Sequence, residues 1–227
     1  TVHKKWDDNT AILSGDAMLI LSYRLMMQNC PLEYVSQVMD VFGTTALEVC
    51  EGQQWDMEFE TRNNVTVEEY IEMIRLKTSV LLAASLKIGA ILGGASACDA
   101  DKLYDFGIKM GLAFQLQDDY LDVYGDPAVF GKNIGGDICC NKKTFMLITA
   151  LNKSTGSDKD ELERWIGLSE FNQAEKISAV TSIYNKIGLP EICQAKINEF
   201  YDEGLKLLDE VNVESAFKVN LREFAQK

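Results

Sequence analysis

An all-α fold is predicted for this chain, and three observations support that prediction. The sequence has 227 residues, of which 47% are hydrophobic, so it can bury a large core. It contains only three prolines, and residues that favour helices, such as Leu, Ala, Met, Glu and Lys, are abundant. Apolar residues recur at helical spacing along most of the chain. No repeat and no long linker divides the sequence, so we expect residues 1–227 to form a single domain of roughly eight or nine helices.

Capping and breaking residues mark the expected helix boundaries. Pro31 ends the first helical pattern and stands where a second helix would start. Thr66 and Glu69 have the spacing of a capping box, which marks the start of a long helix. Pro127 and the glycines up to Gly136 predict a loop. We expect helices at about 9–28, 32–51, 66–93, 99–124, 161–167, 171–187, 190–211 and 213–224, with the second ending near 52–59 and with loops at 127–136 and 152–160.

The composition argues against several classes of protein. The formal net charge is −13, whereas binding to nucleic acid needs clustered Lys and Arg, so we expect no nucleic-acid partner. Six cysteines without C-x-x-C spacing and a single histidine make no zinc pattern, and they favour reduced thiols in the cytoplasm. The longest apolar stretch, 78–92, contains Lys87 and is too short for a transmembrane segment, and no signal peptide precedes it.

The segment from Phe114 to Asp122 places three carboxylates in an otherwise apolar helix. Asp118 and Asp122 share one face at a spacing where like charges destabilise a helix, so local stability does not explain them. A bound cation would explain why these carboxylates stand here. Hard oxygen ligands that point from a helix into a cavity suit Mg²⁺, which completes its shell with water and substrate phosphate. The alternative is a solvated acidic face in a protein that is acidic throughout.

Basic residues lie on both sides of this acidic helix. Lys132 follows a glycine in the loop at 130–137, and Lys142 follows shortly after, where both can meet phosphate oxygens. The loop is not a Walker P-loop, because no Ser or Thr follows Lys132, so ATP binding is disfavoured. Lys77 and Thr78 lie inside the long helix where its apolar half begins, and a lysine there is costly unless it faces a cavity or an anion. Taken alone, Lys77 is also compatible with a side chain that reaches from an apolar surface to solvent.

Taken together, these motifs resemble the trans-isoprenyl diphosphate synthases, which are the polyprenyl synthetase family. The resemblance spans nearly the whole chain and rests on landmarks that occur in one order: Thr1-Val2-His3, 11–16, Gly52-Gln53, Lys77-Thr78, 114–122, Gly131-Lys132, Gly136-Asp137 and Asn141-Lys142.

The resemblance implies an isoprenoid-synthase-type helical bundle around a central cavity. It implies Mg²⁺ as cofactor, with an allylic diphosphate (dimethylallyl, geranyl or farnesyl) and isopentenyl diphosphate as substrates. Magnesium and lysines would stabilise the departing diphosphate, and the allylic cation would be attacked by the double bond of isopentenyl diphosphate. The resemblance implies that Asp118, Asp119 and Asp122 bind the metal and that Lys77, Lys132 and Lys142 bind the diphosphate. It also implies that Thr78 and Gln115 are catalytic polar groups near the reacting carbon, and that Phe114 forms a wall of the cavity.

The sequence departs from the family pattern at its start. The family carries a first aspartate-rich motif and an Arg-Arg-Gly element before residues like Thr1-Val2-His3, and this chain begins just after that point. Asp7 and Asp8 do not replace that motif, because Ala11 stands where the third carboxylate is needed. We expect that an N-terminal part exists in the protein and is missing from this sequence, and that the chain as it stands would be inactive alone.

Other functions stay open at this stage. A class I terpene cyclase would share the fold and the metal chemistry, but it usually has a mixed second metal motif. A non-catalytic partner subunit of a complete synthase, or a plain acidic helical interaction module, would also fit the composition. The resemblance further implies a homodimer, formed through the helices at about 9–28 and 32–51.

Overall fold

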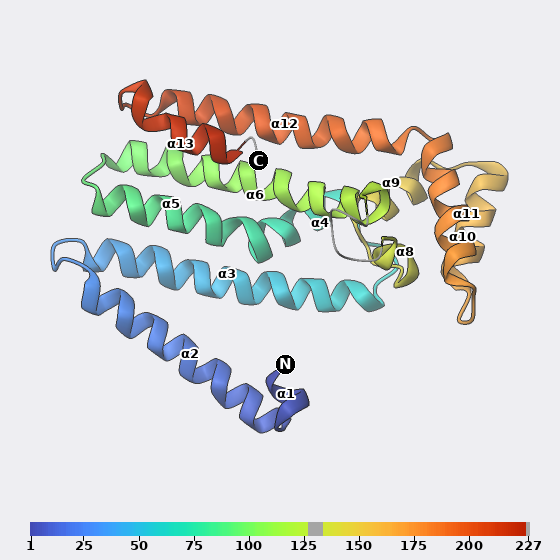
Figure 1. Cartoon of the computed structure of the whole chain (residues 1–227), viewed down its shortest axis with the longest axis horizontal. Helices are drawn as coiled ribbons and strands as arrows, with labels where there is room; N and C mark the ends of the chain where they lie inside the picture. Colours follow the sequence, from blue (N-terminus) through green and yellow to red (C-terminus); the bar gives the residue numbers. More distant parts are fainter. Residues whose placement is uncertain (127–133, 226–227) are drawn as a thin grey trace.

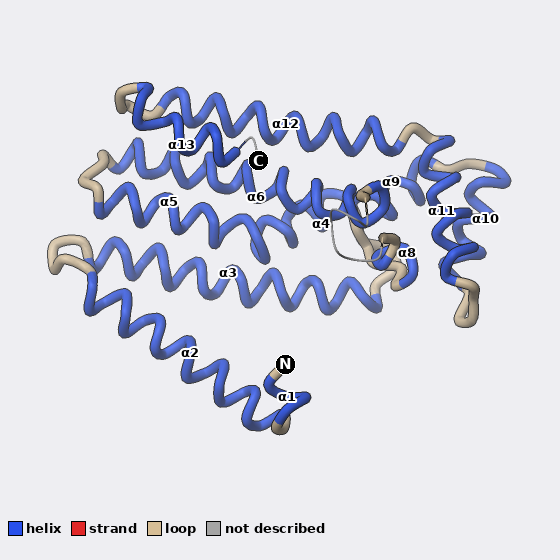
Figure 2. Tube along the Cα trace, viewed as in Figure 1, coloured by secondary structure: helices blue, strands red, loops and turns tan. Residues whose placement is uncertain are grey.

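The computed structural model describes residues 1–126 and 134–225, and within these ranges every regular element is helical. Figures 1 and 2 show most of the long helices running alongside one another, with several of the shorter ones gathered at one end of the molecule. The elements are α1 (Val2–Lys5), α2 (Asp8–Asn29), α3 (Val35–Thr61), α4 (Val67–Ile74), the π-helical turn η1 (Arg75–Ser79), α5 (Val80–Leu92), α6 (Ala97–Tyr124), α8 (Gly136–Cys139), α9 (Phe145–Lys153), α10 (Gly156–Gly167), α11 (Gln173–Lys186), α12 (Leu189–Glu210) and α13 (Ser215–Ala225).

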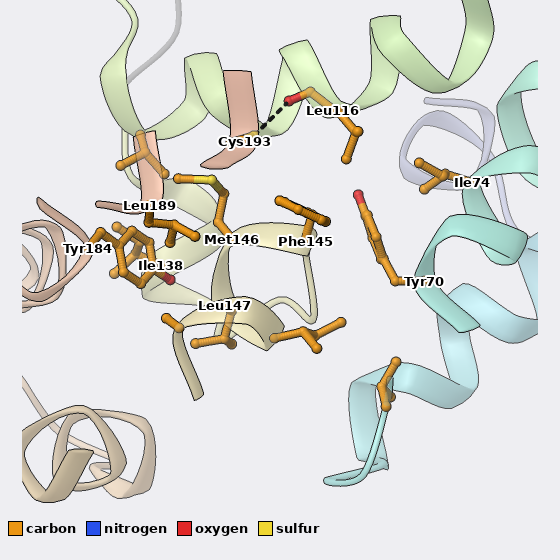
Figure 3. Close-up of a cluster of buried hydrophobic side chains, with 14 of the residues drawn as sticks. Tyr70, Ile74, Leu116, Ile138, Phe145, Met146, Leu147, Tyr184, Leu189 and Cys193 are labelled. Atoms are coloured by element: carbon orange, nitrogen blue, oxygen red, sulfur yellow. Dashed lines mark hydrogen bonds between the residues drawn. The ribbon is translucent and has the colours of Figure 1, made fainter. Parts of the chain in front are cut away.

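Helix α6 lies at the centre of this arrangement. It packs against α5 on one side and α12 on the other, and α3 packs against α5 and η1 (Figure 1). The largest apolar core lies beneath the C-terminal half of α6, where Leu116, Tyr70 and Phe145 are all at least 95% buried (Figure 3). Helix α2 is different, because it has no buried residue and lies at the edge of the molecule.

Glycines permit the closest contacts between helices. A Cβ atom on Gly52 of α3 would lie 2.8 Å from the carbonyl carbon of Leu76 in η1, and it would collide with the backbone nitrogen of Lys77 as well. Gly111 of α6 makes the same kind of contact with Ser79, where an added Cβ would lie 2.7 Å from Ser79 Cβ. These two glycines hold the π-helical turn between α3 and α6.

Several predicted boundaries are confirmed. Helix α2 matches the expected range, and Thr66 and Glu69 form the predicted capping box at the start of α4. The long helix from there to Gly93 is present, but it is interrupted by η1, which the apolar pattern did not reveal.

Two predictions were wrong. The second helix continues to Thr61, because apolar Trp55 and Phe59 extend its buried face and no breaking residue intervenes. The expected loop at 152–160 shrinks to a break at Ser154 and Thr155, after which α10 begins at once. Helix α9 was not predicted, because the residues from Phe145 to Ala150 are all buried and show no alternation between an apolar and a polar face. Of the loop predicted at 127–136, residues 127–133 lie outside the described residues.

No helix in the described part of the chain combines the length and the apolar character needed to cross a membrane.

Candidate active site

The three aspartates of the 118–122 motif have three different surroundings. Asp118 is exposed and lines a groove between α6 and α12. Asp119 points the other way, into the core, and is only 2% exposed. Asp122 is half-buried and accepts a hydrogen bond from the backbone N–H of Asp137 at 3.0 Å. The motif therefore does not present three equivalent carboxylates to one cavity.

Asp119 is enclosed by hydrogen-bond donors. Its Oδ2 accepts a short hydrogen bond from the hydroxyl of Tyr70, and its Oδ1 accepts from Nε2 of Gln115 at 3.5 Å. Burial raises the pKa of Asp119 to about 7, while the Tyr70 hydrogen bond and the positive charge of Lys142 act in the opposite direction. Burial, together with the neighbouring carboxylate, also raises the pKa of Tyr70 well above its usual value, so the phenol keeps its proton.

The groove beside Asp118 has a volume of about 800 Å³ and is mainly apolar. Phe114, predicted as a cavity wall, lines it and is 65% exposed. Asp118 and Leu121 lie toward the C-terminal end of α6, and Met110 lies two turns earlier on the same wall. Side chains from α5, α12 and α13 also line the groove, among them Leu82, Ile197, Tyr201 and Phe224.

Lys77 and Thr78 lie in the π-helical turn, where a π-bulge shifts the register of the helix. Lys77 Nζ forms an ion pair with Asp56 Oδ2 of α3 at 2.6 Å, and the two side chains are 35% and 22% exposed. The Thr78 hydroxyl donates a hydrogen bond to Gln115 Oε1 at 3.2 Å. The structure thus brings Thr78 and Gln115 together, and it supplies Lys77 with a partner, Asp56, that the sequence did not suggest.

Lys142 faces a cluster of carboxylates after α8. Its Nζ lies 3.6 Å from Asp137 Oδ1. Burial lowers the pKa of Lys142, but the charges of Asp137, Asp119 and Asp56 outweigh it and the net pKa is raised. Because Asp56 also pairs with Lys77, both lysines share one acidic neighbourhood.

Asp137 was seen in the sequence only as part of a landmark, yet it belongs to this cluster. Burial raises its pKa, Lys142 lowers it, and the negative charges of Asp122 and Asp118 raise it further. Three carboxylates therefore repel one another around one partly exposed lysine. A bound cation would relieve that repulsion.

This set of donors is compatible with a metal ion that takes its remaining ligands from water or a bound phosphate. Among residues 1–126 and 134–225, no three carboxylate, histidine or cysteine side chains are close enough to make a metal site by themselves. Magnesium usually takes one or two carboxylates and keeps water and phosphate as its other ligands. Asp118 and Asp122 can provide those carboxylates, whereas each oxygen of Asp119 already accepts a hydrogen bond, one from Tyr70 and one from Gln115.

The turn before Lys142 is held by residues that sequence reasoning missed. Asn141 has a φ of 52°, and its side-chain amide donates to the carbonyl of Ile166 at 3.0 Å. Lys176 of α11 is fully buried, and its Nζ donates to Asn141 Oδ1 at 2.7 Å and lies 4.1 Å from the centre of the Phe171 ring. An amphipathic pattern alone gave no signal for a buried lysine in this place. Lys132, the remaining predicted site residue, lies outside the described residues.

A family model described as polyprenyl synthetase matches residues 1–184, which is most of the chain. The chain belongs to the polyprenyl synthetase family. Over 194 residues it is 38% identical to a short chain isoprenyl diphosphate synthase of Methanothermobacter thermautotrophicus, an alignment that covers 86% of this chain and 59% of that protein. The chain therefore spans less than two thirds of the length of that curated relative.

Solved structures of the family agree with this fold. A geranylgeranyl pyrophosphate synthase crystal structure superposes with a TM-score of 0.92 at 43% identity, covering 99% of this chain and 69% of that one. A geranylgeranyl pyrophosphate synthase from Corynebacterium glutamicum, complexed with isoprenyl diphosphate and magnesium, superposes with a TM-score of 0.85 at 30% identity. That alignment covers 96% of this chain and 62% of the other. The predicted all-α isoprenyl synthase fold is thereby confirmed.

Proposed function

We propose that the protein is a Mg²⁺-dependent trans-prenyltransferase that condenses isopentenyl diphosphate with an allylic diphosphate. The observation that carries this proposal is the apolar groove on α6, which has Asp118 on its rim and the acidic cluster with Lys142 close by. A groove lined by Met110, Phe114 and Leu121 suits a hydrocarbon chain, while carboxylates and lysines suit a metal-bound diphosphate. The relative that was crystallised with isoprenyl diphosphate and magnesium supports both assignments.

The reaction begins with cleavage of the allylic C–O bond. The diphosphate leaves with the bonding electrons, the resulting allylic cation is attacked by the double bond of isopentenyl diphosphate, and a proton is then lost to the free diphosphate. Bound magnesium would supply Lewis-acid stabilisation of the leaving diphosphate.

The described residues divide these tasks between them. Asp118 and Asp122 provide oxygen ligands for the metal, and Asp119 stays a predicted ligand whose geometry favours another role. Lys77 and Lys142, together with Lys132 by prediction, neutralise the diphosphate. Thr78 and Gln115 are the catalytic polar groups near the reacting carbon. Phe114 forms a wall of the cavity.

We also propose a homodimer that lies in the cytoplasm, with residues 1–227 belonging to one domain. The apolar side chains on α2 support the dimer, because Leu13, Met18 and Ile20 are each at least 64% exposed and a second copy would cover them. The six free cysteines are consistent with a reducing compartment.

Product analysis tests this function. The protein expressed from its complete reading frame would be incubated with labelled isopentenyl diphosphate, Mg²⁺ and dimethylallyl, geranyl or farnesyl diphosphate in turn. We expect elongated prenyl diphosphates on chromatography, and the longest product would show where elongation stops. A folded protein that forms no product with any primer would contradict the proposal and favour a non-catalytic partner subunit. Cyclic hydrocarbons instead of elongated diphosphates would favour a terpene cyclase.

A further inference from the structure

Tyr70 places a hydroxyl group in a mainly apolar core. It is 1% exposed and reaches from α4 between Ile74 and Phe145, with its hydroxyl directed toward the part of α6 that carries Leu116 (Figure 3). Its hydroxyl donates to Asp119 Oδ2, and Asp119 is itself 2% exposed. Burying a phenol against a carboxylate is costly compared with an apolar pair of the same shape, so packing alone does not explain the choice.

The pair is the first part of a chain of hydrogen bonds that ends in the turn carrying Thr78. Asp119 accepts from Tyr70 on one oxygen and from Gln115 Nε2 on the other, at 3.5 Å. The carbonyl oxygen of the same Gln115 accepts from the Thr78 hydroxyl at 3.2 Å. Four side chains from α4, α6 and η1 are thus linked, and their hydrogen bonds converge on Asp119 from two sides.

The direction of the chain follows from what each group is able to donate. When Asp119 is ionised, its carboxylate only accepts, so Gln115 turns its NH₂ toward Asp119, and its carbonyl then faces Thr78. Thr78 donates its single hydroxyl proton to that carbonyl. The hydroxyl oxygen of Thr78 then has only its lone pairs free. Lone pairs that are directed at the reacting carbon stabilise a developing carbocation.

We propose that Tyr70 and Asp119 are positioning residues, which fix the orientation of Gln115 and Thr78 toward the reacting carbon, and that Asp119 acts through these hydrogen bonds instead of as a metal ligand. This inference rests on the proposed prenyltransferase function. Without the Tyr70 hydroxyl, one oxygen of Asp119 lacks its donor and competes for the Gln115 amide, so the amide and the Thr78 hydroxyl lose their single orientation.

The test is a comparison of initial rates for the parent protein, Tyr70→Phe and Tyr184→Phe. Tyr184 is a matched control, because it lies in the same core and is also 1% exposed. We expect Tyr70→Phe to lower kcat about tenfold, less than the loss of a direct oxyanion donor, because Tyr70 acts through other residues. The KM for the allylic diphosphate and the Mg²⁺ concentration for half-maximal rate should change by less than about twofold. Tyr184→Phe should keep the parent kcat.

The variant Asp119→Asn distinguishes a positioning role of Asp119 from a role as a metal ligand. It also provides a second test of the inference if Tyr70→Phe fails to fold. As a positioning residue, Asp119→Asn lowers kcat at an unchanged Mg²⁺ requirement. A parent-like kcat in Tyr70→Phe, or a raised Mg²⁺ requirement in Asp119→Asn, would overturn the inference while the parent protein turns over normally. A folded parent without any turnover would instead contradict the proposed function, and this inference would fall with it.

Discussion

At the scale of single residues, burial separates side chains that the sequence presents as equals. Asp118 and Asp119 are neighbours in one helix, yet the first borders an open groove and the second lies 2% exposed beside a tyrosine. An α-helix turns neighbouring side chains about 100° apart, so Asp118 and Asp119 point in different directions. The motif therefore supplies both a candidate metal ligand and a candidate positioning residue.

Lys77 provides a residue-scale test of diphosphate binding. We expect Lys77→Gln to raise the KM for the allylic diphosphate about tenfold, because a charge-assisted hydrogen bond is lost. The free energy of unfolding should change by no more than about 1 kcal/mol, since the ion pair of Lys77 with Asp56 is partly exposed. Initial-rate kinetics and urea unfolding would measure the two quantities.

Lys87→Gln is the matched control for that substitution. Lys87 forms an ion pair with Asp101 at 2.6 Å, the same separation as between Lys77 and Asp56, but it does not belong to the site. The control should keep the parent KM. An unaltered KM in Lys77→Gln would remove Lys77 from the set of diphosphate-binding residues.

The candidate site was predictable from the sequence only in part. Asp118, Asp122 and Lys142 all lie close enough to Asp137 to influence its pKa, and a carboxylate spacing in an apolar helix with a lysine downstream is visible in the sequence. Tyr70 and Lys176 left no visible pattern in the sequence. An aromatic residue in an amphipathic helix looks like an ordinary core position, and an isolated lysine looks like an ordinary surface position. Their partners are distant in sequence, and only the fold brings them together.

At the scale of elements, the π-helical turn positions the catalytic side chains. A π-bulge adds a residue to a helical turn and rotates the side chains around it, and such bulges are frequent at functional sites. Gly52 and Gly111 let α3 and α6 approach the turn closely enough to hold it. Sequence periodicity predicted one continuous helix here, because an interruption of a single turn barely disturbs an apolar pattern.

Gly52→Ala tests whether this close contact matters. The added Cβ would meet the backbone of η1, so the free energy of unfolding should fall by about 1–3 kcal/mol in urea unfolding. kcat should fall as well, because Lys77 and Thr78 would move. Gly89→Ala on α5 is the control: nothing lies within 4 Å of its added Cβ, and alanine should stabilise that helix by about 0.5–1 kcal/mol. A Gly52→Ala protein as stable as the parent would show that the contact is not tight.

At the scale of the whole molecule, net charge and exposed apolar surface have opposite effects on self-association. The net charge of −13 opposes self-association, whereas α2 exposes large apolar side chains along its length. The number and order of the long helices could be predicted from periodicity, but helix α9 could not, because its residues from Phe145 to Ala150 are all buried and show no polar face.

The proposed homodimer predicts the mass of the protein in solution. In sedimentation velocity the parent should have twice the mass of one chain. The double variant Leu13→Glu/Ile20→Glu should have the mass of one chain, because the two positions are 67% and 64% exposed and share one face of α2. Phe217→Glu on α13, 74% exposed at the opposite edge of the molecule, should remain dimeric (Figure 1). A monomeric parent would contradict the proposed dimer.

The most direct test of the central claim, a prenyltransferase site built around Asp118 beside the apolar groove, is the Mg²⁺ dependence of the condensation rate. Initial rates with labelled isopentenyl diphosphate and an allylic diphosphate would be measured across Mg²⁺ concentrations for the parent, Asp118→Asn and Asp105→Asn. Asp105 lies on the exposed surface of the same helix, away from the groove. The account predicts that the parent requires Mg²⁺, that Asp118→Asn loses at least about 100-fold in rate or needs far more Mg²⁺, and that Asp105→Asn matches the parent. Equal rates and equal Mg²⁺ requirements in all three proteins would contradict it.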